Sequence, residues 1–398
     1  MNRPTRVLSL YEGFFAGGAR ILHTDVIAGL HAGSDQTHSV LSIASTARRE
    51  GSTQYLHRDP RFLRLAGAGV DVTTLGRTGG IDSLGPSTFT DSQLRTAAEA
   101  VRRADVILSL KEQPLGLLLA LQEHGMMPDV PVVACLHRSD PNHSGPALSW
   151  LTDASRSGLL TATISCAEST SDAYGPFFSP TMERFVIGNG IDSARFRPGT
   201  ADEQAATRER FGIPASAAVV VLAARFDAMK NPGLFLRSAA EFSRQRPETH
   251  FLVCGAGMTR DNEAFHALLA ESGVTDATNL HALGIRDDMP AIYQIADIVA
   301  LTSAFGEASP LCLLEGAASG ATPVTTDVGD SALTVKGIGF VTAQDPSDIV
   351  TTWHGVLERR PELRELSLAA RARLGRDRMI GEYAAVVDTL LESNRAAA

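Results

Sequence analysis

The sequence predicts an α/β protein made of two Rossmann-like, parallel-sheet domains that face each other across a cleft. The chain has 398 residues, which is enough for two domains of ordinary size. Short β-branched runs alternate with longer helical stretches, a pattern that indicates parallel sheets covered by helices. The alternation breaks once and then restarts. We therefore expect an N-terminal domain at 1–187, a linker at 188–210 and a C-terminal domain at 211–376.

The first domain is expected to begin with a strand at Val7–Tyr11, a turn at Gly17-Gly18 and a helix from about Ala19 to His31. Another helix is expected at Asp91–Ala104. Further short apolar runs predict strands at Ser39–Ala44, Asp105–Leu110, Val130–Leu136 and Leu160–Ser165.

Glycine, proline and charged residues dominate from Gly188 to about Glu209, which is the basis for the expected linker. The last segment, Asp377–Asn394, has the pattern of an amphipathic helix. Between them, strands are expected at Ala217–Ala224, His250–Cys254, Ile298–Leu301 and Val324–Thr326, and helices at Pro232–Gln245, at Asp261–Ser272 and from Asp288 onward.

Composition and charge exclude several classes of function. The net charge of −9 argues against a nucleic-acid partner, which would require a concentrated basic face. The four cysteines lie far apart in the sequence, so we expect buried thiols rather than metal ligands, and a cytoplasmic location. No signal-peptide pattern and no apolar run of about 18 residues is present, so at most peripheral membrane contact is expected.

The segment Phe305–Gly320 gives the strongest indication of chemistry. It follows a predicted strand and opens a helix, for which Ser309 is the expected N-cap and Pro310 the first helical residue. The N–H groups of the first turn, such as those of Leu311 and Cys312, would point into the cleft. The positive end of the helix dipole favours an anion there.

Two glutamates accompany this helix start. Glu315 lies one turn into the helix among apolar residues, where a carboxylate needs partners. The two hydroxyls of a ribose would supply donors, although a structural carboxylate bonded to backbone is the alternative. Glu307 lies before the helix, in the loop.

Two cations follow another predicted strand. Arg225 and Lys230 lie in the turn between this buried strand and a helix that begins with proline. Cations at the carboxyl end of a strand fit a diphosphate, with arginine acting as a fork and lysine as a point charge. A solvated surface pair is the alternative.

The N-terminal half offers two further candidates. Gly17 and Gly18 would let the backbone approach a ligand at a helix start, or simply form a turn. His137 ends a buried strand and is placed to bond a sugar hydroxyl or an acceptor, or is satisfied by backbone. The three-glycine dinucleotide fingerprint is incomplete here and at Gly255–Arg260, which disfavours nicotinamide-dependent redox chemistry.

Taken together, these segments resemble family 4 of the GT-B glycosyltransferases, a large retaining group. The match is dense in the C-terminal half and thin in the N-terminal half, as expected if the N-terminal domain binds diverse acceptors. The marks occur in the family's order: the turn Gly17–Arg20, the domain-junction signature Ile187–Pro198, the spacing of Arg225 and Lys230, the pair Glu307 and Glu315 with seven residues between them, and the following segment Gly320–Gly329.

The resemblance implies a retaining glycosyltransferase that moves a hexosyl group from a UDP- or GDP-sugar to an acceptor hydroxyl. The acceptor would be a small molecule, a glycan or a lipid-linked compound, in polysaccharide, glycolipid or secondary-metabolite biosynthesis. No metal or other cofactor is expected. The helix 377–398 would pack back on the N-terminal domain.

The resemblance also assigns roles in donor binding. Arg225 and Lys230 would hold the diphosphate, and Glu315 would bind the ribose hydroxyls. The base would lie against the loop that contains Ile285 and Arg286. The glycines Gly17 and Gly18 would approach the donor from the N-terminal domain.

The transferred sugar would be bound by Glu307 and by the N–H groups of Ala308 and Ser309, with His137 close to the sugar and the acceptor. Many relatives have Glu-Gly-Phe-Gly where this chain has Glu307-Ala-Ser-Pro310, so altered sugar contacts are expected. The family's His-Asp pair appears here as His137-Arg-Ser-Asp140, which puts the role of Asp140 in doubt.

Other functions remain open at this point. One alternative is a different GT-B enzyme, either a sugar phosphorylase or a nucleotide-sugar epimerase. Another is a non-catalytic subunit that binds nucleotide sugars. For acceptor contact, the candidates are the loop Arg138–Pro146, which contains His143, and the segment Lys111–Pro114.

Overall fold

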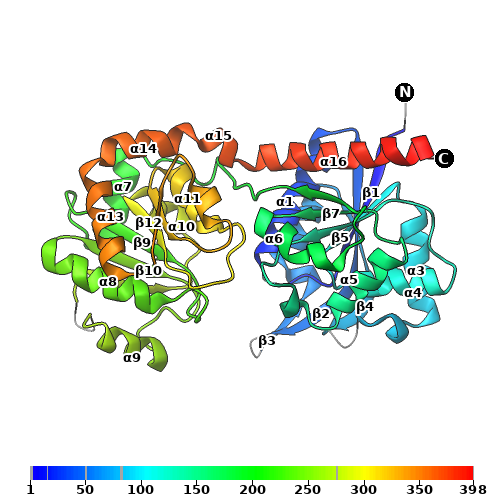
Figure 1. Ribbon diagram of the computed structural model, residues 1–398, viewed down its shortest axis with the longest axis horizontal. Helices are drawn as coiled ribbons and strands as arrows, with labels where there is room; N and C mark the ends of the chain where they lie inside the picture. The colour runs from blue at the N-terminus through cyan, green and yellow to red at the C-terminus, as the bar shows by residue number, and fades with distance from the viewer. Residues whose placement is uncertain (1–2, 16, 50–51, 81–83, 275–276, 398) are drawn as a thin grey trace. The chain divides into compact units, whose positions relative to one another are not determined.

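The computed structural model describes residues 3–15, 17–49, 52–80, 84–274 and 277–397 (Figure 1). The chain divides into two compact units, which are described one at a time. The N-terminal unit comprises Met1–Asn189 together with Arg376–Ala398, and the C-terminal unit comprises Gly190–Gly375.

An eight-stranded sheet forms the centre of the N-terminal unit. Its strand order is β3-β2-β1-β5-β6-β7-β8, and β4 pairs with β2. All neighbours are parallel except β2 and β3. The strands are β1 (Thr5–Tyr11), β2 (Gln36–Arg49), β3 (Ser52–Tyr55), β4 (Asp71–Gly79), β5 (Val106–Leu110), β6 (Val132–Leu136), β7 (Ala162–Ser165) and β8 (Glu183–Val186).

Helices cover both faces of this sheet, and the C-terminal helix α16 packs against α1 (Figure 1). The contact is close, because a Cβ added at Gly29 would lie 2.4 Å from Cδ1 of Ile380. The helices are α1 (Gly18–Gly33), α2 (Pro60–Gly67), α3 (Asp91–Arg102), α4 (Leu115–Glu123), α5 (Ala147–Arg156), α6 (Glu168–Tyr174) and α16 (Arg376–Ala397), with short 3-10 turns η1 (Leu56–Arg58), η3 (Pro86–Thr88), η4 (Pro141–Ser144) and η5 (Gly175–Phe177).

The C-terminal unit contains a six-stranded, wholly parallel sheet of order β11-β10-β9-β12-β13-β14. Its strands are β9 (Val219–Ala223), β10 (His250–Cys254), β11 (Leu280–Gly284), β12 (Ile298–Leu301), β13 (Thr322–Thr326) and β14 (Phe340–Thr342). Its helices are α7 (Ala201–Arg210), α8 (Pro232–Gln245), α9 (Glu263–Glu271), α10 (Met289–Gln294), α11 (Leu311–Ser319), α12 (Ser331–Val335), α13 (Pro346–Glu358), α14 (Arg360–Ala369) and α15 (Arg371–Leu374).

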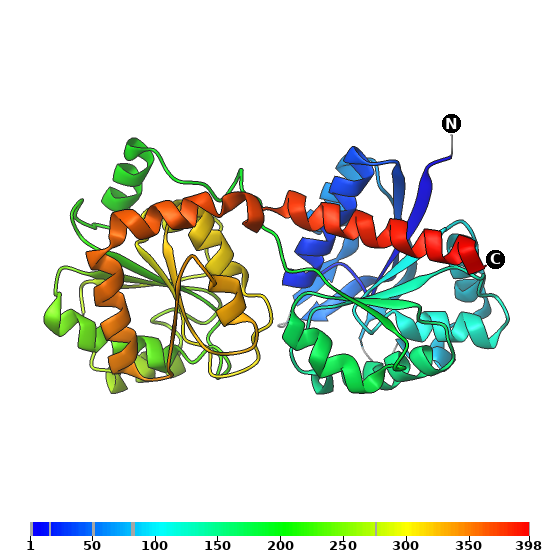
Figure 2. The same cartoon turned by 45° about the horizontal axis from the view of Figure 1, so that its top comes forward.

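Both faces of the β9 strand are buried, because helices pack on each side of the sheet (Figure 2). Val219 and Val221 belong to one apolar cluster, and Val220 and Leu222 belong to the other. Successive side chains of a strand point to opposite faces, which explains why this strand is apolar throughout. The strand order reverses between β9 and β12, and ligands of such sheets bind beyond the carboxyl ends at this switch point.

The predicted fold class, two Rossmann-like domains with parallel sheets, is confirmed in each unit. The structure differs from the expected linker over 201–210, since these residues form α7 of the C-terminal unit. The helix is capped by Thr200, whose side chain accepts from the N–H of Glu203, while the Glu203 side chain binds the Thr200 N–H. The high content of charged residues suggested a linker, whereas the capping box favours a helix that begins after Thr200.

The cysteines are present as thiols, and Cys135, Cys166 and Cys254 are buried as predicted, while Cys312 is half-buried. Burial raises the pKa of Cys135 and of Cys254 to about 12, so these groups stay protonated near neutral pH. Within the described ranges, no group of three or more metal-ligating side chains is clustered. Among the described residues, no helix is both long enough and apolar enough to cross a bilayer.

Candidate active site

The loops that follow β9 and β12 are bonded to each other at the switch point of the C-terminal sheet. Thr302 Oγ1 donates to the carbonyl oxygens of Lys230 and Asn231, at 3.3 and 3.2 Å. Asn231 has left-handed backbone angles (φ 44°, ψ 57°) and caps α8 by accepting from Leu234 N–H at 3.3 Å. This local structure fixes Lys230 immediately before the helix and beside the loop after β12.

Lys230 and Glu307 form an ion pair across these two loops. Lys230 Nζ lies 2.5 Å from Glu307 Oε1, and the side chains are only 16% and 5% exposed. Ser303 Oγ donates to the same carboxylate oxygen. Lys230, predicted for the diphosphate, and Glu307, predicted for the sugar, therefore contact each other in this structure. A bound diphosphate would share Lys230 with Glu307.

Gly329 lies against the backbone of Glu307. Its φ is +54°, and an added Cβ would lie 1.8 Å from the Glu307 carbonyl oxygen. Any larger residue at this position must displace the loop that carries the carboxylate. The position of Glu307 thus depends on a glycine 22 positions later in the chain.

We expect Gly329→Ala to destabilise the protein by about 1–3 kcal/mol, because alanine is strained at this φ and its Cβ would overlap the Glu307 carbonyl oxygen. The displaced Glu307 should lower the expected glycosyl transfer at least about 10-fold. Gly337→Ala is the matched control, since Gly337 also has a positive φ (+76°) but has no atom within 4 Å of an added Cβ. Denaturant unfolding and turnover should both be measured. Equal effects of the two substitutions would show that the Glu307 contact is unimportant.

Glu315 projects from α11 and lines a cavity of about 330 Å³ in the C-terminal unit. The buried Tyr293 donates its hydroxyl hydrogen bond to the Glu315 carboxylate. Burial is the largest influence on this carboxyl and raises its pKa to about 7, against the opposing effects of Tyr293 and Arg195. Of the residues predicted for the site, Arg225, Ile285, Arg286, Cys312 and Glu315 all line this cavity.

Two arginines line this cavity, and they differ in exposure and in their ion-pair geometry. Arg225 is 69% exposed and lies 3.1 Å from Asp227. Arg286 donates to both carboxylate oxygens of Asp288, at 2.8 and 2.7 Å, and these bonds lower the pKa of Asp288. Arg286 is therefore committed to a structural pair, and Arg225 is the more available cation. Ile285 is 80% exposed at the same cavity and offers an apolar surface.

The helix start differs by one residue from the prediction. α11 begins at Leu311 and its N-cap is Pro310, so the expected capping by Ser309 is wrong. Pro310 has ψ 112°, outside the helical range, and its side chain cannot cap. Leu311 and Cys312 still occupy the first turn, whose N–H groups have no acceptor within the helix. Ala308 and Ser309 are half-buried in the preceding loop.

Sequence reasoning missed Tyr293 and Arg195, both of which act on Glu315. Tyr293 lies on α10 in an apolar run and reads as an ordinary core residue. Arg195 lies in the expected linker, where a charged residue has no special meaning. The tertiary contact of α10 with α11 reveals Tyr293, and the influence of Arg195 on Glu315 likewise depends on the tertiary fold.

Gly17, Gly18 and His137 belong to the N-terminal unit. Gly17 is the N-cap of α1, and its carbonyl oxygen accepts from the N–H groups of Arg20 and Ile21 at 3.2 and 3.3 Å. Burial lowers the pKa of His137 to about 3, with a smaller contribution from the charge of Lys111. His137 is therefore neutral at pH 7. Its Nε2 atom is buried and has no hydrogen-bond partner in the described part of the chain.

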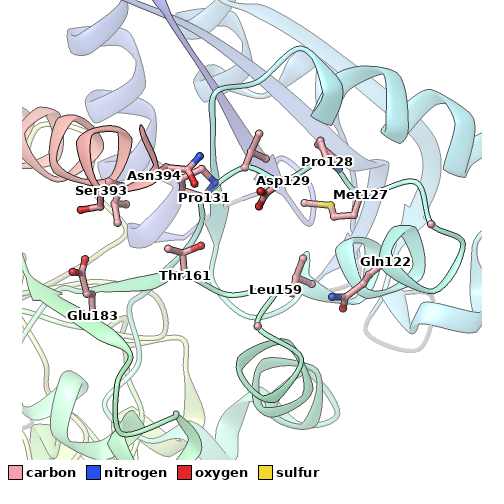
Figure 3. Close-up of a pocket in the computed structure, with 14 residues that line it drawn as sticks. Gln122, Met127, Pro128, Asp129, Pro131, Leu159, Thr161, Glu183, Ser393 and Asn394 are labelled. Carbon is pink, nitrogen blue, oxygen red and sulfur yellow. The ribbon is translucent and has the colours of Figure 1, made fainter. Parts of the chain in front are cut away.

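The N-terminal unit also contains a cavity of about 510 Å³ at the opposite ends of its strands (Figure 3). Pro131 and Thr161 directly precede β6 and β7, Glu183 begins β8, and Asn394 comes from the end of α16. These are amino ends of strands, whereas ligands of parallel sheets bind at carboxyl ends. None of the predicted site residues lines this cavity.

Comparison with known proteins adds two kinds of finding. The model of the family described as glycosyl transferases group 1 matches residues 203–373. The D-inositol 3-phosphate glycosyltransferase of Salinispora arenicola is 34% identical over 162 residues, which are 38% of this chain and 36% of that protein. That of Corynebacterium kroppenstedtii is 30% identical over 181 residues, 42% and 38% of the two chains. The matches thus span less than two-fifths of these relatives.

Solved structures match over nearly the whole chain. Anabaena Alr3699/HepE in complex with UDP has a TM-score of 0.76 at 18% identity, covering 97% of this chain and 100% of that one. Sucrose-phosphate synthase from Thermosynechococcus elongatus has a TM-score of 0.70 at 15% identity, covering 98% and 100%. These identities show the fold alone, which is GT-B. Residues 203–373, which lie in the C-terminal unit, match the glycosyl transferases group 1 family, in line with the resemblance to family 4 that the sequence shows in this half.

Proposed function

We propose that this chain is a retaining glycosyltransferase that moves a hexosyl group from a nucleotide diphospho-sugar to an acceptor hydroxyl. The observation that carries the proposal is the grouping of Lys230, Glu307 and Glu315 beyond the carboxyl ends of β9 and β12. The proposed phosphate-binding cation Lys230 and the two proposed hydroxyl-binding carboxylates, Glu307 and Glu315, then lie at the switch point, where such sheets bind ligands. The family match covers all three residues.

UDP is the nucleotide we propose first, because a protein of the same fold, Anabaena Alr3699/HepE, has been solved with UDP and with UDP-glucose. In this arrangement Glu315 accepts hydrogen bonds from the ribose hydroxyls. The exposed Ile285 covers one face of the base, and Arg225 and Lys230 hold the diphosphate. Arg286 supports the loop through Asp288 rather than binding phosphate.

The proposed chemistry is electrostatic. As the glycosidic bond breaks, positive charge develops on the anomeric carbon and negative charge on the leaving phosphate. Lys230, Arg225 and the N–H groups of Leu311 and Cys312 supply a fixed positive field for that phosphate. The leaving phosphate would then remove the proton of the acceptor hydroxyl on the same face, which retains the anomeric configuration.

Glu307 is proposed to bind hydroxyls of the transferred sugar, together with the N–H groups of Ala308 and Ser309. Pro310 has no N–H, so one donor found in relatives with glycine at this place is missing. His137, which is neutral at pH 7, is proposed to bond the sugar or the acceptor with an uncharged ring.

We propose that the N-terminal unit binds the acceptor and the C-terminal unit the donor. A small molecule, a glycan or a lipid-linked compound would serve as acceptor. D-Inositol 3-phosphate, which the names of the curated relatives contain, is the first compound to try.

The direct test is incubation of the protein with UDP-glucose or GDP-mannose and a panel of hydroxyl acceptors, including D-inositol 3-phosphate. We expect acceptor-dependent release of the nucleoside diphosphate, an α-linked product from these α-linked donors, and unchanged turnover when EDTA is added. Epimerised donor without acceptor would identify an epimerase, and dependence on inorganic phosphate a phosphorylase. Binding of UDP with no turnover on any acceptor would identify a non-catalytic subunit.

A further inference from the structure

A second cavity, of about 360 Å³, lies in the N-terminal unit at the carboxyl ends of its strands. We call it the arginine cavity. It is lined by Arg48 on β2, Gln113 after β5, and Arg138 and His143 after β6. Ligands of parallel sheets bind at this end, so its position is that of a binding site.

Two polar atoms at this cavity have no hydrogen-bond partner within the described ranges. Gln113 is 5% exposed and its Oε1 atom is unpartnered. The Nε atom of Arg138 is also buried without a partner. Buried polar atoms are normally bonded, so a ligand with both an acceptor and a donor would complete them.

The charges around the cavity favour an anion. Arg48 is exposed, and it forms no ion pair with the other residues that the structure describes. The one carboxylate in the lining, Glu12, lies 2.9 Å from Arg20 and is already neutralised by it. Arg48 is therefore the cation at this cavity without a carboxylate partner among the described residues, while Arg138 lies beside the buried Glu112.

A buried network holds this side of the cavity in place. Glu112 is fully buried and accepts a hydrogen bond from the hydroxyl of Tyr174. Ser144, in the turn η4 that also carries His143, lies 3.2 Å from the same hydroxyl. The other Glu112 oxygen lies 4.0 Å from Arg138 Nε. Glu112 is thus held in place beside Arg138, and Arg138 Nε remains without a hydrogen bond within the described ranges, so a ligand can supply its acceptor.

We propose that the arginine cavity binds the acceptor, and that this acceptor carries a phosphate or another anionic group beside its hydroxyls. Arg48 and Arg138 bind the anionic group, and Gln113 Oε1 accepts a hydrogen bond from a hydroxyl. The inference rests on the proposed function only in calling the ligand an acceptor. The anion belongs either to a soluble polyol phosphate or to a lipid headgroup.

The test is calorimetric titration of the full chain with glucose 6-phosphate, myo-inositol 1-phosphate and glycerol 3-phosphate, each beside its dephosphorylated counterpart. Phosphatidylcholine vesicles with and without phosphatidylinositol form a separate arm. We expect at least one phosphorylated ligand to bind 10-fold or more tightly than its counterpart, and preference for the polyols or for the vesicles identifies the source. No preference for phosphate in any arm would overturn the proposal.

The arginine variants complete the test. Arg48→Gln and Arg138→Gln should each weaken binding of the phosphorylated ligand by about 10- to 100-fold, as for other charge-assisted hydrogen bonds. Arg95→Gln, at an exposed position on α3, is the matched control and should change nothing. Arg138 faces buried Glu112, so its variant needs a thermal-unfolding check, whereas Arg48 is exposed. Unchanged affinity in Arg48→Gln and in folded Arg138→Gln would refute the assignment.

UDP binding separates this inference from the proposed function. The variants of Arg48 and Arg138 should bind UDP like the unmodified protein, because Arg225, Lys230 and Glu315, which are proposed to hold the diphosphate and the ribose, lie in the C-terminal unit. Absence of UDP binding in the unmodified protein would instead contradict the proposed function and leave the anion measurement intact.

Discussion

Lys230→Met should lower glycosyl transfer by about 10²- to 10³-fold, the effect of removing one preorganised group that stabilises developing negative charge. The side chain is 16% exposed and held by Glu307 at 2.5 Å, so its position is fixed before the donor arrives. Methionine keeps an unbranched side chain that is one atom shorter, and it removes the charge. Initial rates with saturating acceptor, compared at several donor concentrations, should show the loss mainly in kcat.

The same substitution should destabilise the protein by about 3–5 kcal/mol, because Glu307 is 5% exposed and loses its cation. The double variant Lys230→Met/Glu307→Gln should recover most of this stability and none of the activity. Lys336→Met is the matched control, since Lys336 is exposed in the same unit and should affect neither quantity. Turnover near the unmodified level in Lys230→Met would contradict its role at the diphosphate.

Glu315→Gln should make the unliganded protein more stable at pH 8 and leave its stability near pH 4.5 almost unchanged. Burial raises the pKa of Glu315 from 4.5 to about 7 in the folded state, so the folded protein binds this proton more tightly than the unfolded chain. Stability therefore falls as pH rises from about 4.5 to 7, by about 3 kcal/mol for a shift of this size. Glutamine resembles the protonated acid and avoids the loss.

The same substitution, which should stabilise the protein at pH 8, should weaken nucleotide binding. Glu315→Gln should weaken UDP binding by about 10- to 100-fold at pH 8, because the charged acceptor for the ribose hydroxyls is gone. Glu358→Gln, at an exposed position on α13, serves as the control for both measurements. Calorimetry at pH 8 and denaturant unfolding across the pH range test the two effects. A variant that binds UDP normally would show that Glu315 is the structural carboxylate considered as its alternative.

The central strands of both sheets could be predicted from the sequence because both of their faces are buried. β10 and β12 have the predicted bounds, and α8 spans the predicted Pro232–Gln245. Five strands were not predicted, and all of them lie at sheet edges. Edge strands have fewer apolar neighbours, and β4, for example, alternates between exposed and half-buried residues. The unpredicted strands are β3, β4, β8, β11 and β14.

The spacing of the motifs predicted which loop and which helix carry the candidate site residues, but it did not predict which side chains contact one another. The pattern around Glu307 and Glu315 located a loop and a helix start, although the helix begins at Leu311 and not at Pro310. The one-residue difference has a local cause, because the ψ of 112° at Pro310 lies outside the helix. Spacing along a chain fixes which residues follow a strand, but side-chain partners depend on which strands are neighbours.

The sequence by itself determined the alternation of strands and helices, the two parallel sheets and the family to which residues 203–373 belong. These follow from periodicity and from local motifs, whose physics involves residues a few positions apart. Tertiary structure alone decided that Lys230 contacts Glu307, 77 residues away, and that Tyr293 on α10 binds Glu315 on α11. It also brought Arg48 and Arg138 to one cavity. Such pairs form only when the strand order carries distant loops to the same edge of a sheet.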